Sequence, residues 1–502
     1  MGTTMNLSML LEMAADADGD RIAVGTRRDG LTYRELLELS RRYGSQIGRL
    51  DAQALAYLDL NSPTCIALLF GCSYAGVPFA PINYRWTDQQ VGRALERLAP
   101  VAVVAGADFT ARVESSDSVS LLDLNTLDAA ADEAVAARNE HSPAVLLFTS
   151  GTSGDPKAAV LRSSNLVPYV VSTIEFFNAG PEEAILVSVP PYHIASVSSA
   201  LTSVYSGRRI VQLPAFHPES WVDLAAEEAI THAMVVPTML GRILDVLEQR
   251  GQRLDSLRHL SYGGGRMPVE TVERALALLP GVDLVNAYGL TETSSTIAVL
   301  GPEDHRIAAA SNDPSVRARL GSVGRPIPSI ELEVRSDDGS ALPAGAAGEV
   351  WVRGEQVSGE YLSHSAVVEG GWYPTRDHGH LDADGYLFLH GRADDVIVRG
   401  GENIAPAEIE DCLRSHKAVA DVAVVGVPDA EWGERVEAVV VLAAGKAAGS
   451  EELQELVRVT LRSTRVPAQI HYRDALPYNE LGKLLRREVR TELAALLEGV
   501  TA

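Results

Sequence analysis

Glycine and hydroxylated residues fill a short stretch directly after an apolar run, in the order Thr149-Ser-Gly-Thr-Ser-Gly-Asp-Pro-Lys157. The apolar run, Val145–Phe148, is too short for a helix and predicts a buried strand. Glycines let the backbone approach a ligand, free N–H groups and hydroxyls donate hydrogen bonds, and a lysine ammonium can meet a phosphate. The stretch therefore predicts a loop that holds a polyphosphate, built from Thr149, Ser150, Gly151, Thr152, Ser153, Gly154 and Lys157.

This loop differs from the common nucleotide loop G-x-x-x-x-G-K-[ST], which needs a glycine before the lysine and a hydroxyl after it. Here Pro156 precedes Lys157 and Ala158 follows it. A Ser/Thr/Gly surface linker is the alternative interpretation. The strand before the loop and the apolar pair Val160-Leu161 after it favour a ligand loop.

Three other clusters of polar and glycine residues follow predicted strands, at Pro190–His193, Gly263–Arg266 and Tyr288–Glu292. Open α/β sheets bind ligands at the carboxyl ends of their strands. Tyr288 offers an aromatic face, Thr291 a hydroxyl, and Glu292 a carboxylate for Mg²⁺ that bridges phosphates. Each has an ordinary structural explanation alone, since Glu292 could cap a helix and His193 could be a packing histidine. Together with the loop they predict one cleft.

Further polar motifs lie in the second half of the chain. Asp377, in Thr375-Arg-Asp377, could accept both hydroxyls of a ribose, and Arg392 could donate to the same sugar or its phosphate. Lys483 directly follows a glycine turn. The run from Asp377 to Asp384 contains two histidines and three aspartates, which raises a metal site as an alternative to the solvated turn that we expect there.

Apolar runs alternate with helical patterns, which predicts an α/β fold. From Glu331 the pattern changes to shorter strands and turns, typical of a β-rich subdomain, and the last region predicts a compact α+β domain. The expected helices include Thr32–Leu50, Pro63–Ala75, Ser196–Ser206, Pro268–Leu279 and Glu451–Arg462. The expected strands include Ala54–Leu60, Ala184–Val189, Arg209–Leu213, Leu257–Tyr262, Asp283–Ala287, Gly348–Arg353 and Val419–Val427.

Composition narrows the class of protein. The 502 residues exceed one ordinary domain, and a hydrophobic content of 46% suffices for several cores. A formal charge of −24 disfavours nucleic acid and anionic membranes as partners. Cys65, Cys72 and Cys412 show no metal or disulfide spacing. The acidic N-terminus does not resemble a signal peptide, and no apolar run is long enough to cross a membrane, so we expect a cytoplasmic protein.

Six motifs, in order, resemble the adenylate-forming superfamily of acyl-CoA synthetases, peptide-synthetase adenylation domains and luciferases, with acyl- or aryl-CoA ligases as the nearest match. They are Thr149–Lys157, Tyr288-Gly-Leu-Thr-Glu292, Thr375-Arg-Asp377, Gly391-Arg392 with Asp394-Asp395, Gly400-Gly-Glu-Asn with Pro406 and Glu408-Ile-Glu410, and Gly482-Lys483. The resemblance runs from about Thr32 to Lys483. It implies a large N-terminal α/β domain over 1–393, with a β-rich subdomain over about 320–393, and a small mobile α+β domain over 394–502.

The resemblance implies a two-step ligase in which a carboxylate attacks the α-phosphate of ATP, and a thiol then displaces AMP from acyl-AMP. The C-terminal domain of this family swings about a hinge between the steps, and Asp394 matches that hinge. Lys483 would bridge the charges in the first step, with Thr291, Glu292 and His193 as the other catalytic residues. Glu292 would ligate Mg²⁺. The implied ATP site adds Gly264, Gly265, Tyr288, Gly289, Asp377 and Arg392 to the loop, and the implied CoA site comprises Arg85, Gly400, Gly401 and Trp432.

The substrate implied by the resemblance is an uncharged aliphatic, alicyclic or aromatic acid. Amino-acid-activating relatives carry an aspartate near Pro190–Ser196, and this segment has none. The expected pocket is lined by Tyr192, His193, Val236, Gly263 and Gly289.

Several alternatives stay open at this stage. A carrier protein could replace CoA as the acceptor, a pseudoenzyme could keep the fold without the chemistry, and a luciferase-like oxidation could follow adenylation. Leu254-Asp-Ser-Leu257 mimics a phosphopantetheine attachment site, although it leads into a predicted core strand. The sequence allows a homodimer.

Overall fold

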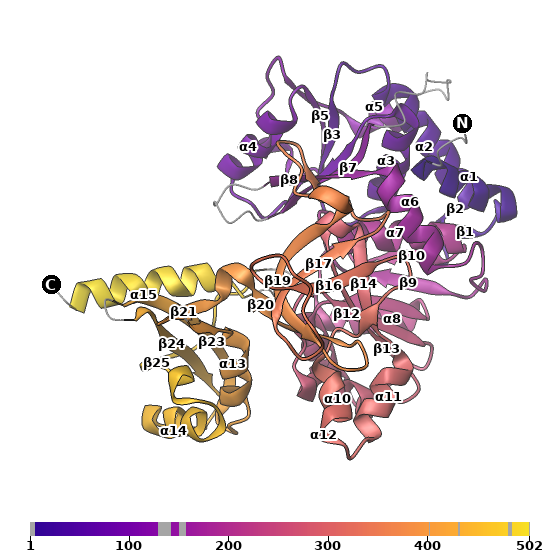
Figure 1. The fold of residues 1–502 in the computed structure, drawn as a ribbon. Helices are drawn as coiled ribbons and strands as arrows, with labels where there is room; N and C mark the ends of the chain where they lie inside the picture. The colour runs from indigo at the N-terminus through magenta and orange to yellow at the C-terminus, as the bar shows by residue number, and fades with distance from the viewer. Residues whose placement is uncertain are drawn as a thin grey trace. The chain divides into compact units, whose positions relative to one another are not determined.

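The computed structural model describes residues 6–128, 142–149, 157–400, 402–429, 432–479 and 484–500. Its internal contacts divide the chain into two compact units. One comprises Met1–Glu331 and Val352–Tyr373, and the other comprises Leu332–Trp351 and Pro374–Ala502 (Figure 1).

A nine-stranded sheet forms the centre of the first unit. Strands β9 to β13 of this sheet run parallel to one another, so their carboxyl ends share one edge. In spatial order the strands are β15 (Arg325–Pro326), β14 (Ser295–Leu300), β13 (Asp283–Leu290), β12 (His259–Gly263), β11 (His232–Val235), β9 (Ala184–Val187), β10 (Arg209–Gln212), β1 (Ile22–Val24) and β2 (Leu31–Thr32).

A seven-stranded sheet forms the other half of this unit. In spatial order its strands are β18 (Glu360–Tyr361), β8 (Lys157–Arg162), β7 (Pro143–Thr149), β4 (Phe79–Pro81), β3 (Ala54–Leu58), β5 (Val101–Ala105) and β6 (Val119–Leu121). Both faces of β3 are buried, because Leu55 and Tyr57 join one hydrophobic cluster and Ala56 and Leu58 join another. Burial on both faces is typical of parallel strands.

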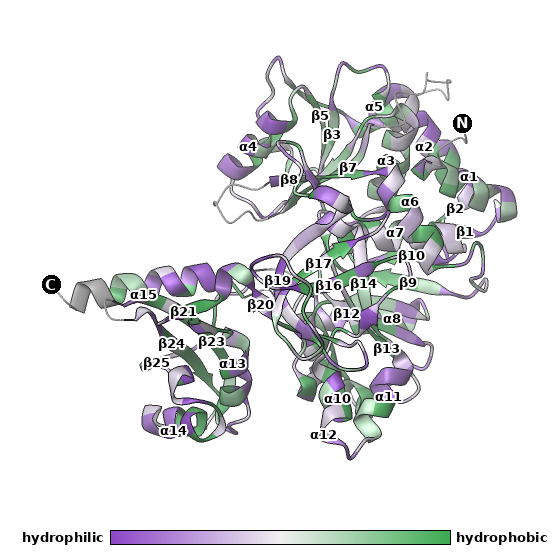
Figure 2. Ribbon diagram, in the orientation of Figure 1, coloured by the Kyte–Doolittle hydropathy of each residue, from purple (hydrophilic) through white to green (hydrophobic). Residues whose placement is uncertain are grey.

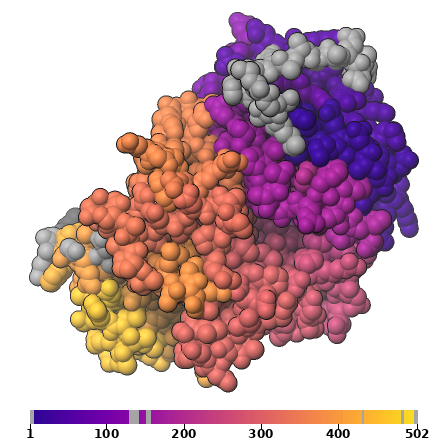
Figure 3. Space-filling view, turned by 45° about the vertical axis from the view of Figure 1, so that its right-hand side comes forward, coloured from indigo at the N-terminus to yellow at the C-terminus, as the bar shows by residue number. Residues whose placement is uncertain are grey.

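Helices cover both sheets. Most of them pack in the main hydrophobic cluster, and α4 packs in a second cluster with the seven-stranded sheet. The helices of the first unit are α1 (Leu7–Asp18), α2 (Tyr33–Ile47), α3 (Pro63–Ala75), α4 (Asp88–Leu98), α5 (Leu124–Asp128), α6 (Ser163–Thr173), α7 (Ile194–Ser206), α8 (Pro218–Glu227), α9 (Pro237–Arg250), α10 (Val269–Leu278), α11 (Pro302–Ala310) and α12 (Pro314–Ala318). α1 contacts α7, far along the chain, and Figure 3 shows the indigo N-terminal surface against the magenta surface of this later segment.

Helix α3 shows how local sequence sets these elements. Pro63 stands in its first turn, and Gly76 ends it with φ of 62°, a left-handed conformation that favours glycine. Its packing on α2 is close, since a Cβ at Gly71 would lie 2.9 Å from the Cβ of Tyr43. The sequence predicted both ends of this helix correctly.

A four-stranded sheet, β16 (Glu331–Arg335), β17 (Gly348–Arg353), β19 (Tyr373–Leu381) and β20 (Leu387–Arg392), belongs mostly to the second unit. The solvated turn expected in the run Asp377–Asp384 is confirmed only for the end of that run, because Asp377–Leu381 lie in β19 and pair with β20. The turn follows at Asp382–Gly385. A side-chain contact fixes the strand, since His380 Nδ1 lies 2.8 Å from His390 Nε2.

A five-stranded sheet, β21 (Ile397–Arg399), β22 (Glu402–Ile404), β23 (Val419–Asp429), β24 (Gly433–Leu442) and β25 (Gln469–Arg473), completes the second unit. Val422 and Val424 of β23 pack with α13 (Pro406–Arg414) and α14 (Ser450–Thr460). Ala423 and Val425, on the other face, pack with α15 (Arg486–Val500). β23 and β24 accordingly are mostly green, the hydrophobic colour, in Figure 2, and the expected α+β character of this region is confirmed.

The helices and the cysteines bear on the environment of the protein. None of the described helices combines the length and the apolar character needed to cross a membrane. Cys65, Cys72 and Cys412 are buried free thiols. Burial raises the pKa of Cys412, which keeps this thiol protonated at neutral pH.

Candidate active site

The carboxyl ends of β9, β11 and β12 bring three of the expected site residues together. A Cβ placed on Gly264 would lie 3.6 Å from Cγ1 of Val236 and 4.0 Å from Cε1 of His193. The next glycine is as close to α9, because a Cβ on Gly265 would lie 3.6 Å from Cγ of Pro237. These distances are ordinary van der Waals contacts, so His193 and Val236 line the same space as the two glycines.

His193 stands at the N-cap of α7, where its Nδ1 accepts a hydrogen bond of 3.2 Å from the Ala195 N–H. An accepting Nδ1 leaves the proton on Nε2, which is then available as a donor. Burial lowers the pKa of His193 to about 4. The imidazole is therefore neutral at physiological pH, and it can donate a hydrogen bond without adding a charge.

Two further glycines are required by close backbone contacts. A Cβ on Gly263 would lie 2.2 Å from the Ala287 carbonyl oxygen, and one on Gly289 would lie 1.8 Å from the Ser295 carbonyl oxygen. Gly289 sits where the pairing of β13 with β14 shifts register. Any side chain at either position would displace the strand ends that carry Gly264 and Tyr288.

The glycine-rich loop connects two antiparallel strands. Thr149 ends β7 and pairs with Lys157, which begins β8. The expected strand before the loop is confirmed, since Val145, Leu146 and Leu147 are buried. The loop residues Ser150, Gly151, Thr152, Ser153 and Gly154 lie outside the described residues. The flanking strands therefore hold both ends of the loop side by side.

Tyr361, which no sequence motif indicated, connects the loop strand with the acidic motif. It pairs with Ala159 of β8, and its ring centroid lies 5.8 Å from the Lys157 ammonium nitrogen. Its hydroxyl donates a hydrogen bond of 2.6 Å to Oε1 of Glu292. Arg162 holds the same strand through two hydrogen bonds to the Glu360 carboxylate, of 2.7 and 3.0 Å.

Glu292 is buried, and the segment before Tyr361 also holds its backbone. The N–H groups of Ser358 and Gly359 donate to its carbonyl oxygen at 2.9 and 3.0 Å. Oε2 of its carboxylate has no hydrogen bond with the described residues. No group of three His, Cys, Asp or Glu side chains suited to a metal occurs in the described part of the chain. A single fixed carboxylate fits Mg²⁺, which takes one or two carboxylates together with substrate phosphates.

The other expected residues of the first unit lie near these strand ends or in an adjacent aromatic cluster. Tyr288 is buried near the end of β13, and Thr291 begins a 3₁₀ turn, Thr291–Thr293, that contains Glu292. Tyr192 contacts Tyr84 edge-on, with 5.5 Å between ring centroids. The exposed Arg85 lies with its guanidinium carbon 5.6 Å from the Tyr84 ring.

The second unit carries the expected ribose residues. Asp377 and Arg392 lie opposite each other on β19 and β20, and Nη1 of the arginine donates to Oδ1 of Asp377 at 3.0 Å. Asp377 is buried, and its own N–H donates to the Thr375 hydroxyl. The pair therefore presents a carboxylate and a guanidinium on neighbouring strands, although the two residues are 15 positions apart in the chain.

The expected hinge and three of the four expected CoA residues, all but Arg85, also lie in this unit. Asp394, in the 3₁₀ turn Ala393–Asp395, forms an ion pair of 3.1 Å with Arg376. Gly400 has φ of 58°, its N–H donates to the Trp432 carbonyl oxygen at 2.8 Å, and a Cβ there would lie 3.0 Å from the Trp432 ring. Gly401 and Lys483 lie outside the described residues.

The mimic of a phosphopantetheine attachment site is a core element. Leu254 and Leu257 are both buried, and they belong to the main hydrophobic cluster of the first unit. Ser256 is half-buried between them, three residues before the start of β12 at His259. This burial favours the structural interpretation of the motif over a surface attachment site.

Two family models match the chain, and together they cover most of it. Residues 11–362 match the AMP-binding enzyme model, and residues 408–483 match the AMP-binding enzyme C-terminal domain. The chain therefore belongs to the AMP-binding enzyme family, the adenylate-forming enzymes that its motifs resemble.

Two similar proteins are named as ligases that join a carboxylic acid to CoA or to an acyl carrier protein. Indoleacetate–CoA ligase from Aromatoleum aromaticum is 30% identical, over 98% of each chain. A fatty acid–[acyl-carrier-protein] ligase, ScoC, from Streptomyces coeruleorubidus is 31% identical, over 92% of this chain and 91% of its own.

A solved structure shows the same fold with a reaction intermediate bound. It is o-succinylbenzoate CoA synthetase from Bacillus subtilis in complex with its acyl-adenylate, with a TM-score of 0.84 and 28% identity over 97% of this chain and 99% of that one. The same enzyme was also solved with ATP and a magnesium ion, with a TM-score of 0.81, 28% identity, and coverage of 95% and 98%. The expected fold class, enzyme class and use of ATP and Mg²⁺ are thereby confirmed at the level of the family.

Proposed function

We propose that this chain is an ATP-dependent carboxylic acid:CoA ligase that works through an acyl-AMP intermediate. The similarity to a CoA ligase over 98% of both chains carries the proposal. In the first step, a carboxylate oxygen attacks the α-phosphorus of ATP and pyrophosphate leaves. In the second, a thiolate attacks the acyl carbon, AMP leaves with that carboxylate oxygen, and a thioester results.

Residues of both units would take part in the first step. The loop from Thr149 to Lys157 would hold the β- and γ-phosphates, and Thr291 would contact the α-phosphate. Tyr288 would stack on adenine beside Gly264 and Gly265, with Gly289 at the same strand end. Lys483 would bridge the charges of the carboxylate and the phosphate, a role suited to an ammonium on a flexible stem. Asp377 and Arg392 would hold the ribose.

Glu292 would hold Mg²⁺, which neutralises phosphate charge when bound. Tyr361 supports this role, because its hydroxyl fixes one carboxylate oxygen, and the other oxygen has no hydrogen bond with the described residues. Its ring also contacts Lys157 at the start of the loop strand. We therefore assign Tyr361 as a positioning residue for Glu292.

The acid is uncharged apart from its carboxylate. The space beside Gly264 is bordered by Val236 and a neutral His193, and neither group compensates an ammonium. Burial of such a charge without a partner would be costly. Aliphatic, alicyclic and aromatic acids fit this description. Indoleacetate, the acid in the name of one relative, is the first to test.

The acceptor is CoA, with a carrier protein as the alternative because one relative is named for an acyl carrier protein. Gly400, Gly401 and Trp432 would line the passage for the pantetheine arm. The contact of Gly400 with the Trp432 ring supports this, since any larger residue would enter that space. Arg85 would meet the nucleotide end of CoA.

The remaining features of the proposal concern the whole chain. We assign 1–393 as the N-terminal domain and 394–502 as the mobile domain, with Asp394 as the hinge. The buried free cysteines support a reducing compartment such as the cytoplasm. The negative charge disfavours nucleic acid and membranes as partners.

Pyrophosphate release and acyl-CoA formation, measured across a panel of carboxylic acids with and without CoA, test this function. Acid-dependent pyrophosphate release with acyl-CoA as the product is the expected result. Adenylate without acyl-CoA would favour the carrier-protein alternative, and no release with any acid would refute the enzyme assignment.

A further inference from the structure

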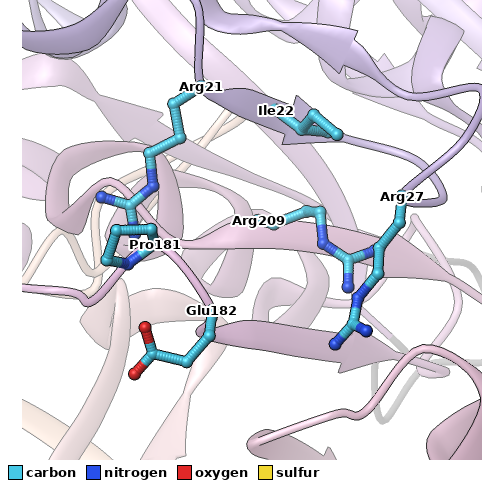
Figure 4. Close-up of a pocket in the computed structure, with 6 residues that line it drawn as sticks. All are labelled: Arg21, Ile22, Arg27, Pro181, Glu182 and Arg209. Atoms are coloured by element: carbon cyan, nitrogen blue, oxygen red, sulfur yellow. The ribbon is translucent and has the colours of Figure 1, made fainter.

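A pocket of about 290 Å³ lies in the first unit, away from the strand ends that carry the proposed active site. It is lined by Arg21, Ile22, Arg27, Pro181, Glu182 and Arg209 (Figure 4). Arg209 is the first residue of β10, and Glu182 comes just before β9. The pocket is therefore at the amino ends of these parallel strands, and the proposed active site is at their carboxyl ends. The four residues of β9 alone separate the two edges by about 13 Å.

The lining is strongly basic for so acidic a protein. Three of the six lining residues are arginines and one is a glutamate, whereas acidic residues outnumber basic ones by 67 to 43 in the whole chain. Glu182 is also close to a cation outside the pocket, since its carboxylate lies 3.7 Å from Arg258. The six lining residues therefore carry three positive charges against one negative charge, before the buried Glu228 that pairs with Arg209 is counted.

Buried contacts fix the centre of this pocket. Arg209 is buried, and its Nη1 donates to a Glu228 carboxylate oxygen at 2.6 Å and to the Gly25 carbonyl oxygen at 3.1 Å. The same Glu228 oxygen accepts a hydrogen bond of 3.1 Å from the Arg27 backbone N–H. The turn between β1 and β2 is thus tied to Arg209, which places Arg27 at the pocket.

Several guanidinium donors remain unused at this site. The side chain of Arg27 has no hydrogen bond or ion pair with the described residues. Arg21 donates through Nη2 to the carbonyl oxygens of Ala179 and Gly180, and its guanidinium carbon lies 5.3 Å from the Phe177 ring. Burial lowers the pKa of Arg209, Glu228 opposes this shift, and the nearby charge of Arg27 adds to it through repulsion. A bound anion would offset this repulsion.

We propose that Arg21, Arg27 and Arg209 form a second, non-catalytic binding site for a phosphate group. Guanidinium groups bind phosphate through paired N–H donors. The volume is at the lower end of the range for ligand pockets, which suits inorganic phosphate, pyrophosphate or the phosphate end of a larger metabolite. Pyrophosphate is released in the proposed reaction. If it binds at this pocket, the pocket would fill as the product accumulates.

Binding of inorganic phosphate, pyrophosphate and glycerol 3-phosphate to the full-length protein tests the site by calorimetry. The variants are Arg27→Gln, Arg28→Gln and Glu182→Gln. Arg28 is the matched control, because it is the exposed neighbour of Arg27 and does not line the pocket. Phosphate binding at the proposed active site is common to all four proteins, since the substituted residues lie at the opposite edge of the sheet.

Loss of one charged hydrogen-bonding group predicts roughly tenfold to hundredfold weaker binding in Arg27→Gln. Arg28→Gln should bind as the wild type does, and Glu182→Gln should bind more tightly because a like charge is removed. Melting without phosphate checks that each variant is folded. Equal binding in Arg27→Gln and the wild type, equal losses in Arg27→Gln and Arg28→Gln, or no Arg27-dependent binding of any of the three probes would overturn the proposal.

Discussion

Replacing Tyr361 by phenylalanine removes one oxygen atom and tests how Glu292 is held. The hydroxyl donates to Oε1 of Glu292 at 2.6 Å, and no other side chain of the described residues donates to this carboxylate. Phenylalanine keeps the aromatic ring beside Lys157 and the strand pairing with Ala159. The substitution therefore isolates one hydrogen bond to a buried carboxylate.

A hydrogen bond to a charged group contributes about 1.5–3 kcal/mol, and the buried carboxylate would lose its fixed position. We expect adenylate formation to fall roughly tenfold to hundredfold at limiting Mg²⁺. Part of this loss should be recovered at high Mg²⁺, because the ion can then select the productive orientation of Glu292. The affinity for the carboxylic acid should change little.

The assay is acid-dependent pyrophosphate release as a function of Mg²⁺ concentration. Tyr205→Phe is a matched control, since Tyr205 lies in α7, its ring contacts Phe176, and its hydroxyl has no hydrogen bond with the described residues. A double-mutant cycle with Glu292→Gln then gives the coupling energy of the pair. An unchanged Mg²⁺ dependence in Tyr361→Phe, with a coupling below about 0.5 kcal/mol, would refute the positioning role.

Four other substitutions test the state of His193, the two half-reactions and the contact at Gly400. The pKa of His193 is about 4 in the folded protein and about 6.5 in the unfolded chain. Between these pH values the unfolded chain binds a proton at this residue and the folded protein does not. The free energy of unfolding therefore decreases as the pH falls from about 6.5 to 4, by up to about 3 kcal/mol. In His193→Gln, urea unfolding at pH 7 and pH 4.5 should therefore show a smaller acid-induced loss than in the wild type, and an identical loss would exclude a buried neutral imidazole. Asp394→Pro should slow thioester formation from acyl-AMP and spare adenylate formation, whereas Lys483→Ala should do the reverse; if both variants lose both half-reactions equally, the two-conformation assignment fails. Gly400→Ala places a Cβ 3.0 Å from the Trp432 ring at a position with φ of 58°. The substitution should lower the free energy of unfolding by about 1–2 kcal/mol and raise the KM for CoA. Unchanged values in melting and kinetic assays would contradict this reasoning.

The sequence predicted the ends of an element correctly where a single proline or glycine sets the backbone conformation. Pro63 and Gly76 marked the ends of α3, and Gly348–Arg353 was predicted with the bounds of β17. The strand ends could be predicted as one site for a similar reason. Polar residues that follow buried parallel strands must share an edge of the sheet, and the contacts among His193, Val236 and Gly264 agree with this rule.

Contacts between segments that are far apart in the chain could not be predicted from the local sequence. Tyr361 lies in a two-residue strand among serine, glycine and glutamate, too short for any periodicity. β19 was mistaken for a turn because its inward positions include Asp377, whose charge is balanced by Arg392 on the next strand. The arginine pocket draws its residues from positions 21–27 and 181–209, so only the fold brings them together.

Transfer of ¹⁸O from the carboxylic acid to AMP tests whether the reaction passes through acyl-AMP. The acid is labelled with ¹⁸O in its carboxylate and incubated with ATP, Mg²⁺ and CoA, and the AMP is analysed by mass spectrometry. An acyl-AMP intermediate predicts one ¹⁸O atom in AMP for each thioester formed. Unlabelled AMP, or label in inorganic phosphate, would contradict the proposed reaction.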